Sequence, residues 1–422
     1  MLIKVPELLF FGYQGNAPES WSTALNALKN SDQPDSEKAI IRNLVGFAAK
    51  FSLSGDIWQQ WLTWILMSHE NAFSLACERH QVSADSTLMK LAETDCAFFR
   101  SLYHADLSKA GLLSVMRNYQ PPYASDDMNR VGELIEGLSK KLAAAESDRK
   151  FTETITEYYT EFGVGIYGMY KAFRVFPDGK DLELIPVTDD IDVRFDDLIG
   201  LEEQKKTLRE NTESFLNGLE ANNVLLYGDS GTGKSTSVHA LMHDYYTRGL
   251  RLVEISKQDR HLLPRVLASV KKRNYHFIIF LDDLSFEENE SDYKELKAML
   301  EGALEKRSDR VLIYATSNRR HLIRETWTDR NDMEYQNDIH HSDTMEEKLS
   351  LASRFGVTIY YGKPEPKEYL RIVKELAERN NIRIDEKELI DRARKWELRH
   401  GGMSGRTASQ LITWLRGESV KQ

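Results

Sequence analysis

The most constraining feature of this chain is the stretch 224–236, which reads Val-Leu-Leu-Tyr-Gly-Asp-Ser-Gly-Thr-Gly-Lys-Ser-Thr. An apolar run leads into Gly-x-x-x-x-Gly-Lys-Ser, the P-loop pattern, in which backbone N–H groups surround a phosphate. The apolar run is typical of a central parallel strand that is covered on both faces. The residues after the loop suit a helix whose N-terminus points its partial positive charge at the same phosphate. A chance glycine-rich turn is the alternative, but the flanking strand and helix argue against it.

The residues of this loop have separate expected roles. Lys234 is expected to contact the β- and γ-phosphates of a nucleoside triphosphate, and the Ser235 hydroxyl is expected to bind Mg²⁺. The predicted cofactors are therefore ATP and Mg²⁺. The predicted nucleotide-binding residues of the loop are Gly228, Asp229, Ser230, Gly231, Thr232, Gly233, Lys234, Ser235 and Thr236.

Further apolar runs alternate with helical patterns and predict a parallel sheet. The candidate strands after the P-loop are residues 251–255, 276–281, 310–316 and 356–361. Strands that alternate with helices form parallel α/β sheets, and such sheets bind ligands at the carboxyl ends of their strands. From residue 365 onward only helical patterns follow, at 367–379, 386–399 and 406–415, which predicts a small helical C-terminal domain.

An acidic pair follows the second of these strands. Asp282 and Asp283 come directly after the apolar run 276–281. A carboxylate at this place can hold Mg²⁺ beside phosphates, which is the role expected of Asp282. Asp283 is expected to orient or deprotonate an attacking water. The pair could instead cap the next helix, but the P-loop upstream favours the catalytic interpretation.

The N-terminal part of the chain shows helical patterns and no recognisable chemistry. Trp58, Trp61 and Trp64 recur at three-residue spacing and predict a buried helix. A base-stacking platform is the alternative, but it usually carries Arg or Lys where this chain has Gln and Thr. Further helical patterns cover 128–145 and 151–162, and residues 173–186 alternate around Pro177-Asp178-Gly179 as in a hairpin. We expect this region to recognise a protein partner or to support assembly.

Composition limits the classes of function. With 422 residues the chain suits two or three domains, and a net charge of −10 does not favour a generally basic nucleic-acid-binding protein, although a local patch remains possible. The two cysteines lack metal-ligand spacing, no signal peptide is evident, and the apolar stretch 58–67 is too short to span a bilayer. We therefore expect a cytoplasmic protein that does not bind membranes.

Taken together, residues 195–415 resemble an AAA+ ATPase, and within that superfamily a bacterial group of predicted ATPases of unassigned role. Four segments besides the P-loop and the acidic pair resemble family motifs. They are Asp197-Leu198-Ile199-Gly200 beside the adenine, Ala315-Thr316-Ser317-Asn318 at sensor 1, Ser353-Arg354-Phe355-Gly356 at the arginine finger and Gly402-Met403-Ser404-Gly405-Arg406 at sensor 2.

The resemblance implies an α/β fold: a P-loop parallel sheet core with a helical C-terminal lid, preceded by a mainly helical N-terminal domain. The expected domains are 1–190, which ends in a hairpin, then the core 191–363 and the lid 364–422. Asn318 would position the attacking water, and Arg354 would reach the γ-phosphate bound by a neighbouring subunit of a homo-oligomer. Arg406 would contact the γ-phosphate, and Ile199 and Gly200 would contact the nucleotide.

Two departures from the family pattern bear on activity. The usual catalytic acid is Glu, whereas this chain has the shorter Asp283, which suggests slow hydrolysis or a closer water. The turn 256–261 lacks the aromatic-apolar-glycine pore loop of protein-threading unfoldases. Less favoured site candidates are Glu287 as a spare acid, Arg319 and Arg320 as a second finger, Arg394, Arg399 and His400 at sensor 2, and His340 and His341 as metal ligands.

Three functions remain open at this stage. The first is ATP hydrolysis at subunit interfaces to remodel or load a macromolecular partner. The alternative is a slowly hydrolysing, ATP-dependent binding switch or scaffold. A P-loop kinase acting on a small molecule is less favoured, because Asn318, the Arg354 segment and the lid helices argue against it and no separate substrate motif is evident.

Overall fold

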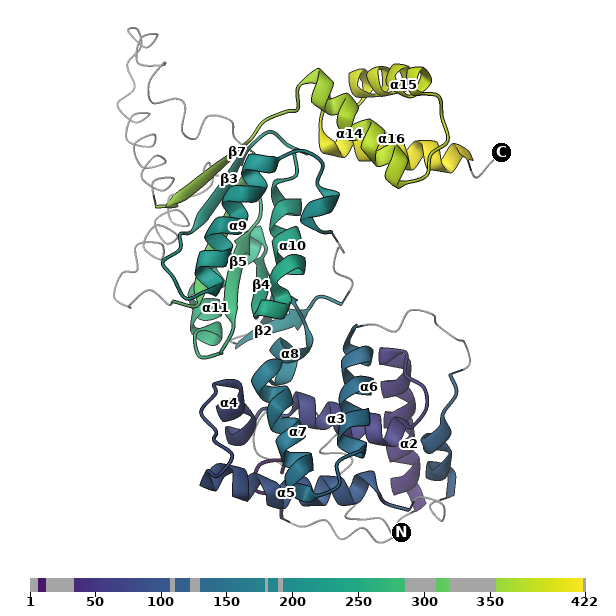
Figure 1. Cartoon of the computed structure of the whole chain (residues 1–422), viewed down its shortest axis with the longest axis vertical. Coiled ribbons are helices and arrows are strands. Elements are labelled where there is room, and N and C mark those ends of the chain that lie inside the picture. Colours follow the sequence, from purple (N-terminus) through teal and green to yellow (C-terminus); the bar gives the residue numbers. More distant parts are fainter. Residues whose placement is uncertain are drawn as a thin grey trace. The chain divides into compact units, whose positions relative to one another are not determined.

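The computed structural model describes residues 7–12, 34–106, 111–121, 130–178, 181–188, 193–284, 309–318 and 354–419. The chain divides into two compact units, Met1–Tyr170 and Lys171–Gln422, and each is described by itself (Figure 1). Among the described helices, none combines the length and the hydropathy needed to cross a bilayer.

The described part of the first unit is helical. Several of its helices begin at a polar N-cap whose side chain accepts a backbone N–H, as Asp56, Ser86 and Ser147 do. The elements are α2 (Pro34–Phe51), α3 (Ile57–Ser68), α4 (Ala72–Glu78), α5 (Thr87–Tyr103), η1 (Gly111–Asn118), α6 (Arg130–Ala143), α7 (Asp148–Glu161) and α8 (Gly165–Met169).

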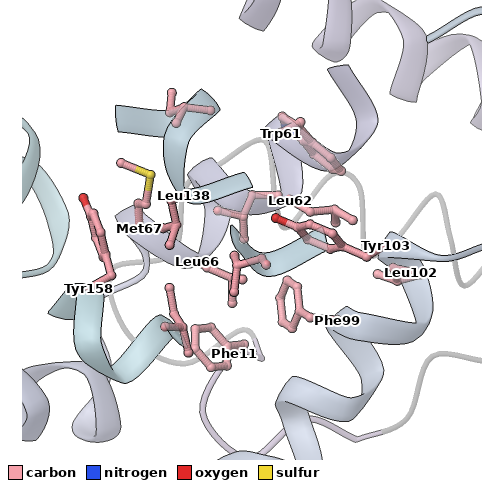
Figure 2. Close-up of a cluster of buried hydrophobic side chains, with 14 of the residues drawn as sticks. Phe11, Trp61, Leu62, Leu66, Met67, Phe99, Leu102, Tyr103, Leu138 and Tyr158 are labelled. Carbon is pink, nitrogen blue, oxygen red and sulfur yellow. The ribbon is translucent and has the colours of Figure 1, made fainter. Parts of the chain in front are cut away.

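Helix α3 supplies much of the core of this unit. Trp58 and Trp61 are 0% and 1% exposed, and the Trp58 indole N–H donates to the Leu102 carbonyl of α5 over 2.9 Å. Figure 2 shows Trp61 and Leu62 of α3 beside Tyr103, and Leu66 above Phe99. The prediction that the tryptophan repeat packs in a core is therefore confirmed.

The segment 7–12 is attached to this core through a buried carboxylate. Asp95 of α5 is 1% exposed and accepts the backbone N–H groups of Leu9, Phe10 and Phe11 over 3.0, 2.7 and 3.1 Å. A buried carboxylate needs such donors, because it would otherwise lose its hydration without compensation. The contact places the Phe11 ring against Phe99, with centroids 5.2 Å apart.

The second unit is built on a seven-stranded sheet in the order β2-β1-β4-β5-β6-β3-β7. Its neighbouring strands run parallel except for the β1–β2 hairpin, which confirms the predicted parallel core. The strand that leads into the P-loop, β3, lies between β6 and β7. The strands are β1 (Ala172–Asp178), β2 (Asp181–Pro186), β3 (Val224–Gly228), β4 (Leu250–Ile255), β5 (His276–Leu281), β6 (Val311–Ser317) and β7 (Val357–Tyr361).

Two groups of helices accompany the sheet. Apolar side chains of α9 (Glu202–Leu216) and α10 (Lys234–Tyr245) share one core with β3, β4 and β5. The shorter elements are η2 (Phe195–Asp197), η3 (Tyr246–Arg248), η4 (Lys257–Leu262) and α11 (Leu263–Val270). Helices α14 (Pro366–Arg379), α15 (Glu386–Arg399) and α16 (Gly405–Ser419) form a separate core. These three helices lie within the range predicted for the lid.

The predicted hairpin exists, but it belongs to the second unit. Its strands β1 and β2 pair from Phe173↔Pro186 to Asp178↔Asp181, and β1 also pairs in parallel with β4. The unit boundary therefore falls between Tyr170 and Lys171, not near residue 190 as the sequence suggested. An isolated two-stranded hairpin is marginally stable in water, whereas this one continues a larger sheet and buries four of its side chains, Ala172, Phe173, Val175 and Leu184.

This boundary predicts how fragments behave. A fragment 171–422 should unfold cooperatively, whereas 191–422 should melt about 10 °C lower or aggregate, because it loses the four buried hairpin residues and exposes the edge of β4. Thermal unfolding followed by circular dichroism, with light scattering, measures both. Equal melting temperatures would place the hairpin outside the folding unit.

Candidate functional site

The P-loop turns sharply at the end of β3 because of three glycines. Gly228, Gly231 and Gly233 have φ values of 130°, 76° and 99°, a region that other residues rarely adopt. A Cβ on Gly228 would lie 2.2 Å from the carbonyl oxygen of Tyr361 on β7, so this position also lacks space for a side chain. Helix α10 then begins at Lys234, and its N-cap, Gly233, provides no side-chain cap for the first backbone N–H groups. A helix start of this kind favours an anion.

The lysine of the loop is folded against the loop itself. Lys234 is 5% exposed, and its Nζ donates to the carbonyl oxygens of Gly228 over 3.1 Å and Asp229 over 2.6 Å. Burial lowers the pKa of Lys234, and the carboxylates of Asp229, Asp282 and Asp283 oppose that shift. A desolvated ammonium that donates to neutral carbonyl oxygens gains strongly from a nearby anion.

The acidic pair lies beside the start of α10. The Ser235 hydroxyl donates to Oδ1 of Asp282 over 2.7 Å, and the Thr316 hydroxyl donates to the same oxygen over 2.5 Å. The parallel register pairs Leu281 with Ala315, which brings the ends of β5 and β6 to the same edge of the sheet. The structure therefore brings the two predicted metal ligands, Ser235 and Asp282, together.

Asp283 is connected to the same strand end. Its backbone N–H donates to the Thr316 hydroxyl over 2.9 Å, and its Oδ1 accepts from the side-chain amide of Asn318 over 2.7 Å. The predicted catalytic acid and the predicted sensor-1 residue are thus in direct contact. Asp283 has a φ of 50°, and Asp tolerates this left-handed conformation better than most residues.

Two residues at this site were not singled out as site residues from the sequence. One is Thr316, which contacts both acids through one hydroxyl. The other is Arg260 of η4, whose Nη2 donates to the carbonyl oxygens of Asp282 over 3.1 Å and Asp283 over 3.0 Å. The strand register could have indicated Thr316, since strand ends in a parallel sheet meet at one edge. No sequence pattern indicated Arg260.

The start of α16 lies against the P-loop. The Arg406 backbone N–H donates to the carbonyl oxygen of Gly231 over 3.2 Å, and a Cβ on Gly231 would lie 3.1 Å from the Cβ of Arg406. The Arg406 side chain is exposed. The predicted sensor-2 residue therefore lies beside the loop.

The segment predicted to contact the nucleotide links two parts of the second unit. Ile199 is 9% exposed and belongs to the core of helices α14, α15 and α16. A Cβ on Gly200 would lie 2.6 Å from Oε1 of Glu368 on α14. The side chains of Leu198 and Leu201 are the nearest to the point where a Cβ on Gly233 would lie. The segment thus extends from the P-loop to the C-terminal helices.

Arg354 lies near the amino ends of the strands, whereas the P-loop lies at their carboxyl ends. It precedes β7 and is exposed, and the register pairs Val357 with Val224, the first residue of β3. The P-loop follows the other end of β3, roughly 15 Å away at the usual rise per residue. The structure does not bring Arg354 to the P-loop of its own chain, so its predicted action on a neighbouring subunit stays a prediction.

The remaining loop residues are placed as follows. The Thr232 hydroxyl donates to the Asp229 carbonyl oxygen over 2.8 Å, Ser230 is exposed, and Thr236 lies half-buried in α10. The Asp229 carboxylate accepts the Lys363 backbone N–H over 3.1 Å. The less favoured candidates Glu287, Arg319, Arg320, His340 and His341 lie outside the described residues.

The donor set fits one hard cation beside phosphates. Within the described ranges there is no group of three or more His, Cys, Asp or Glu residues that could hold a metal ion by itself. The Ser235 hydroxyl and the Asp282 carboxylate are oxygen ligands, and Mg²⁺ commonly binds through one or two protein oxygens together with phosphates and water.

Fold and site together define the class of this protein. It has an α/β P-loop fold, with the P-loop and acidic pair at the carboxyl ends of the strands of a mostly parallel sheet. The chain belongs to the family described as "Protein of unknown function (DUF815)", whose model matches residues 169–419.

The solved structures that match this chain do so at low similarity. The RuvB Holliday junction branch migration motor of Thermotoga maritima is 19% identical, with a TM-score of 0.39, over 54% of this chain and 66% of that one. The FIGL-1 AAA domain in complex with ADP is 21% identical, with a TM-score of 0.38, over 55% of this chain and 75% of that one. The chain thus spans just under two thirds of the RuvB structure, and likenesses at this level assign no function.

The contact between β3 and β7 predicts the effect of a single methyl group. Gly228→Ala places a Cβ against the Tyr361 carbonyl and also strains φ, so we expect a loss of about 3 kcal/mol or more in unfolding free energy. Denaturant unfolding measures it. Gly417→Ala, in α16 with no atom within 4 Å of the new Cβ, is the control and should be neutral or slightly stabilising. Equal stability of both variants would show that β7 moves away at little cost.

Proposed function

We propose that this protein binds ATP with Mg²⁺ at the P-loop and hydrolyses it to ADP and phosphate. One observation carries the proposal: a continuous set of hydrogen bonds joins Ser235, Asp282, Thr316, Asp283 and Asn318 beside the buried Lys234. These residue types, joined by hydrogen bonds in this order, suit a site where phosphate, a metal ion and a water molecule must be held close together.

Lys234 and the first turn of α10 form the phosphate-binding side of the site. The Lys234 ammonium would exchange its carbonyl acceptors for phosphate oxygens, which are charged and therefore better acceptors. Its burial supports this role, because an anion offsets the cost of desolvating the ammonium.

Ser235 and Asp282 would hold Mg²⁺, which supplies positive charge against the phosphates when it is bound. Asp283 and Asn318 would together position the attacking water, with Asp283 accepting its proton. Their direct contact of 2.7 Å supports a shared role. Arg406 would contact the γ-phosphate, since its backbone already lies against the loop at Gly231.

We further propose that hydrolysis takes place at the interface between two copies of the chain. Arg354 lies just before the amino end of β7, whereas its own P-loop lies at the carboxyl ends of the strands, and it is exposed, so we assign it to the site of a neighbour. An arginine that stabilises the transferring phosphate can contribute ~10³–10⁵ to the rate. A head-to-tail interface of this kind produces a ring or a helical oligomer.

The energy of hydrolysis would be used to remodel or load a macromolecular partner. The helical first unit is the part available to recognise a protein, since the site residues all lie in the second unit. A net charge of −10 does not favour nucleic acid as the general partner, and a shift assay at ~0.1 M salt would test a local patch.

A mixing experiment tests the shared site. Lys234→Ala and Arg354→Ala should each lose turnover, the first through phosphate binding and the second through the neighbour's site. A mixture of the two should regain activity at about a quarter of its interfaces, where an intact loop meets an intact arginine. Steady-state phosphate release measures turnover, and nucleotide binding is followed separately.

Arg383→Ala, which removes an exposed arginine C-terminal to α14, is the matched control and should leave turnover unchanged. Wild-type binding and turnover by Arg354→Ala would refute the interface mechanism. Absence of recovery in the mixture, with both variants assembled, would show that Arg354 acts within its own chain or only on structure.

A slowly hydrolysing switch is the second candidate, and the short acid Asp283 favours it. If hydrolysis is slow because the acid does not reach far enough, Asp283→Glu should raise steady-state turnover about tenfold. If the left-handed backbone and the Asn318 contact adapt the site to Asp, the same change should lower it. A rise supports the switch, and a fall supports the remodelling enzyme.

A further inference from the structure

Thr316 of β6 is 2% exposed and contacts both acids of the site through a single hydroxyl. It donates to Oδ1 of Asp282 over 2.5 Å and accepts the backbone N–H of Asp283 over 2.9 Å. A hydroxyl has one hydrogen, so its donor is committed to Asp282 while its lone pair serves Asp283. The positions of the two acids therefore depend on the same atom.

Asp282 has two hydroxyl donors on the same carboxylate oxygen, from Ser235 and Thr316. Ser235 would itself become a metal ligand under the proposed function, so its bond to Asp282 would be rearranged when Mg²⁺ binds. Thr316 would keep its bond, because it is a buried residue of β6 and is not itself a predicted metal ligand. It is thus the group that can hold Asp282 in place both with and without the metal.

The turn that carries the acids makes further hydrogen bonds, to β6 and to η4. The Leu284 backbone N–H donates to the Thr316 carbonyl oxygen over 2.6 Å, and Arg260 donates to the carbonyl oxygens of Asp282 and Asp283. Asp283 is kept in a left-handed conformation with a φ of 50° by these contacts. Strained backbone of this kind persists only where its surroundings fix it.

We propose, on the basis of the function proposed above, that Thr316 is a positioning residue that pre-orders Asp282 for Mg²⁺. Its hydroxyl sets the affinity of the site for the metal ion, whereas its methyl group is not required. The nucleotide itself is bound by the P-loop, so the affinity for nucleotide without metal does not depend on Thr316.

Three variants of the full chain separate the hydroxyl from the volume of the side chain. Thr316→Ser keeps the hydroxyl, Thr316→Ala differs from that variant by the hydroxyl alone, and Thr316→Val keeps the shape of threonine without it. Titrating Mg²⁺ into each protein with bound ADP, by calorimetry, should show about tenfold weaker metal binding in the Ala and Val variants. The Ser variant should stay within about twofold of wild type.

ADP binding in EDTA and the melting temperature are measured on the same samples. We expect unchanged ADP affinity in all variants, which separates positioning from a general structural defect. Equal Mg²⁺ affinity in the Ser and Ala variants would overturn the proposal, as would a Ser variant as weak as Val. If Val does not fold, the Ser and Ala pair decides the question alone.

The same data distinguish this proposal from the proposed function. If wild-type protein binds Mg²⁺ and ADP with the expected dependence on Thr316 but releases no phosphate, hydrolysis is refuted and the positioning role stands. If wild-type ADP binding does not respond to Mg²⁺, the positioning role is refuted. If wild-type protein binds no nucleotide, both proposals fall.

Discussion

The site depends on the parallel register of three strands. β6 pairs on one side with β5 and on the other with β3, so the carboxyl ends of all three meet at one edge. This single arrangement places Asp282, Thr316 and the P-loop within hydrogen-bond reach of one another, although they are separated in sequence by dozens of residues. A shift of β6 by one residue would turn Thr316 to the other face of the sheet and break the connection.

Much of this arrangement could be predicted from local sequence. The P-loop and the acid pair are short patterns whose chemistry requires those residue types at that spacing, and the apolar runs before them identify buried parallel strands. Asp282 and Ser235 meet as expected, and Asn318 contacts Asp283. The burial of Trp58 and Trp61 likewise followed from helical spacing alone.

What could not be predicted depends on contacts between distant segments. The hairpin β1–β2 was visible as a local pattern, but its membership of the sheet depends on pairing with β4, which no local pattern specifies. Arg260 reaches the acid turn from the helix after β4, a contact that requires the strand order to be known. The left-handed backbone at Asp283 is likewise accompanied by bonds to Thr316 and Arg260, which come from segments distant in the sequence.

The backbone at Asp283 offers a physical reason for the shorter acid at this position. A residue with a φ of 50° is more often Asp or Asn than Glu, because a short polar side chain tolerates the left-handed conformation. In this conformation the Asp283 carboxylate already reaches Asn318 at 2.7 Å. The departure from the usual Glu is therefore coupled to the geometry of the turn. Asp283, the backbone of its turn and Arg260 depend on one another. The effect of the shorter side chain at position 283 therefore depends on the backbone conformation of that residue.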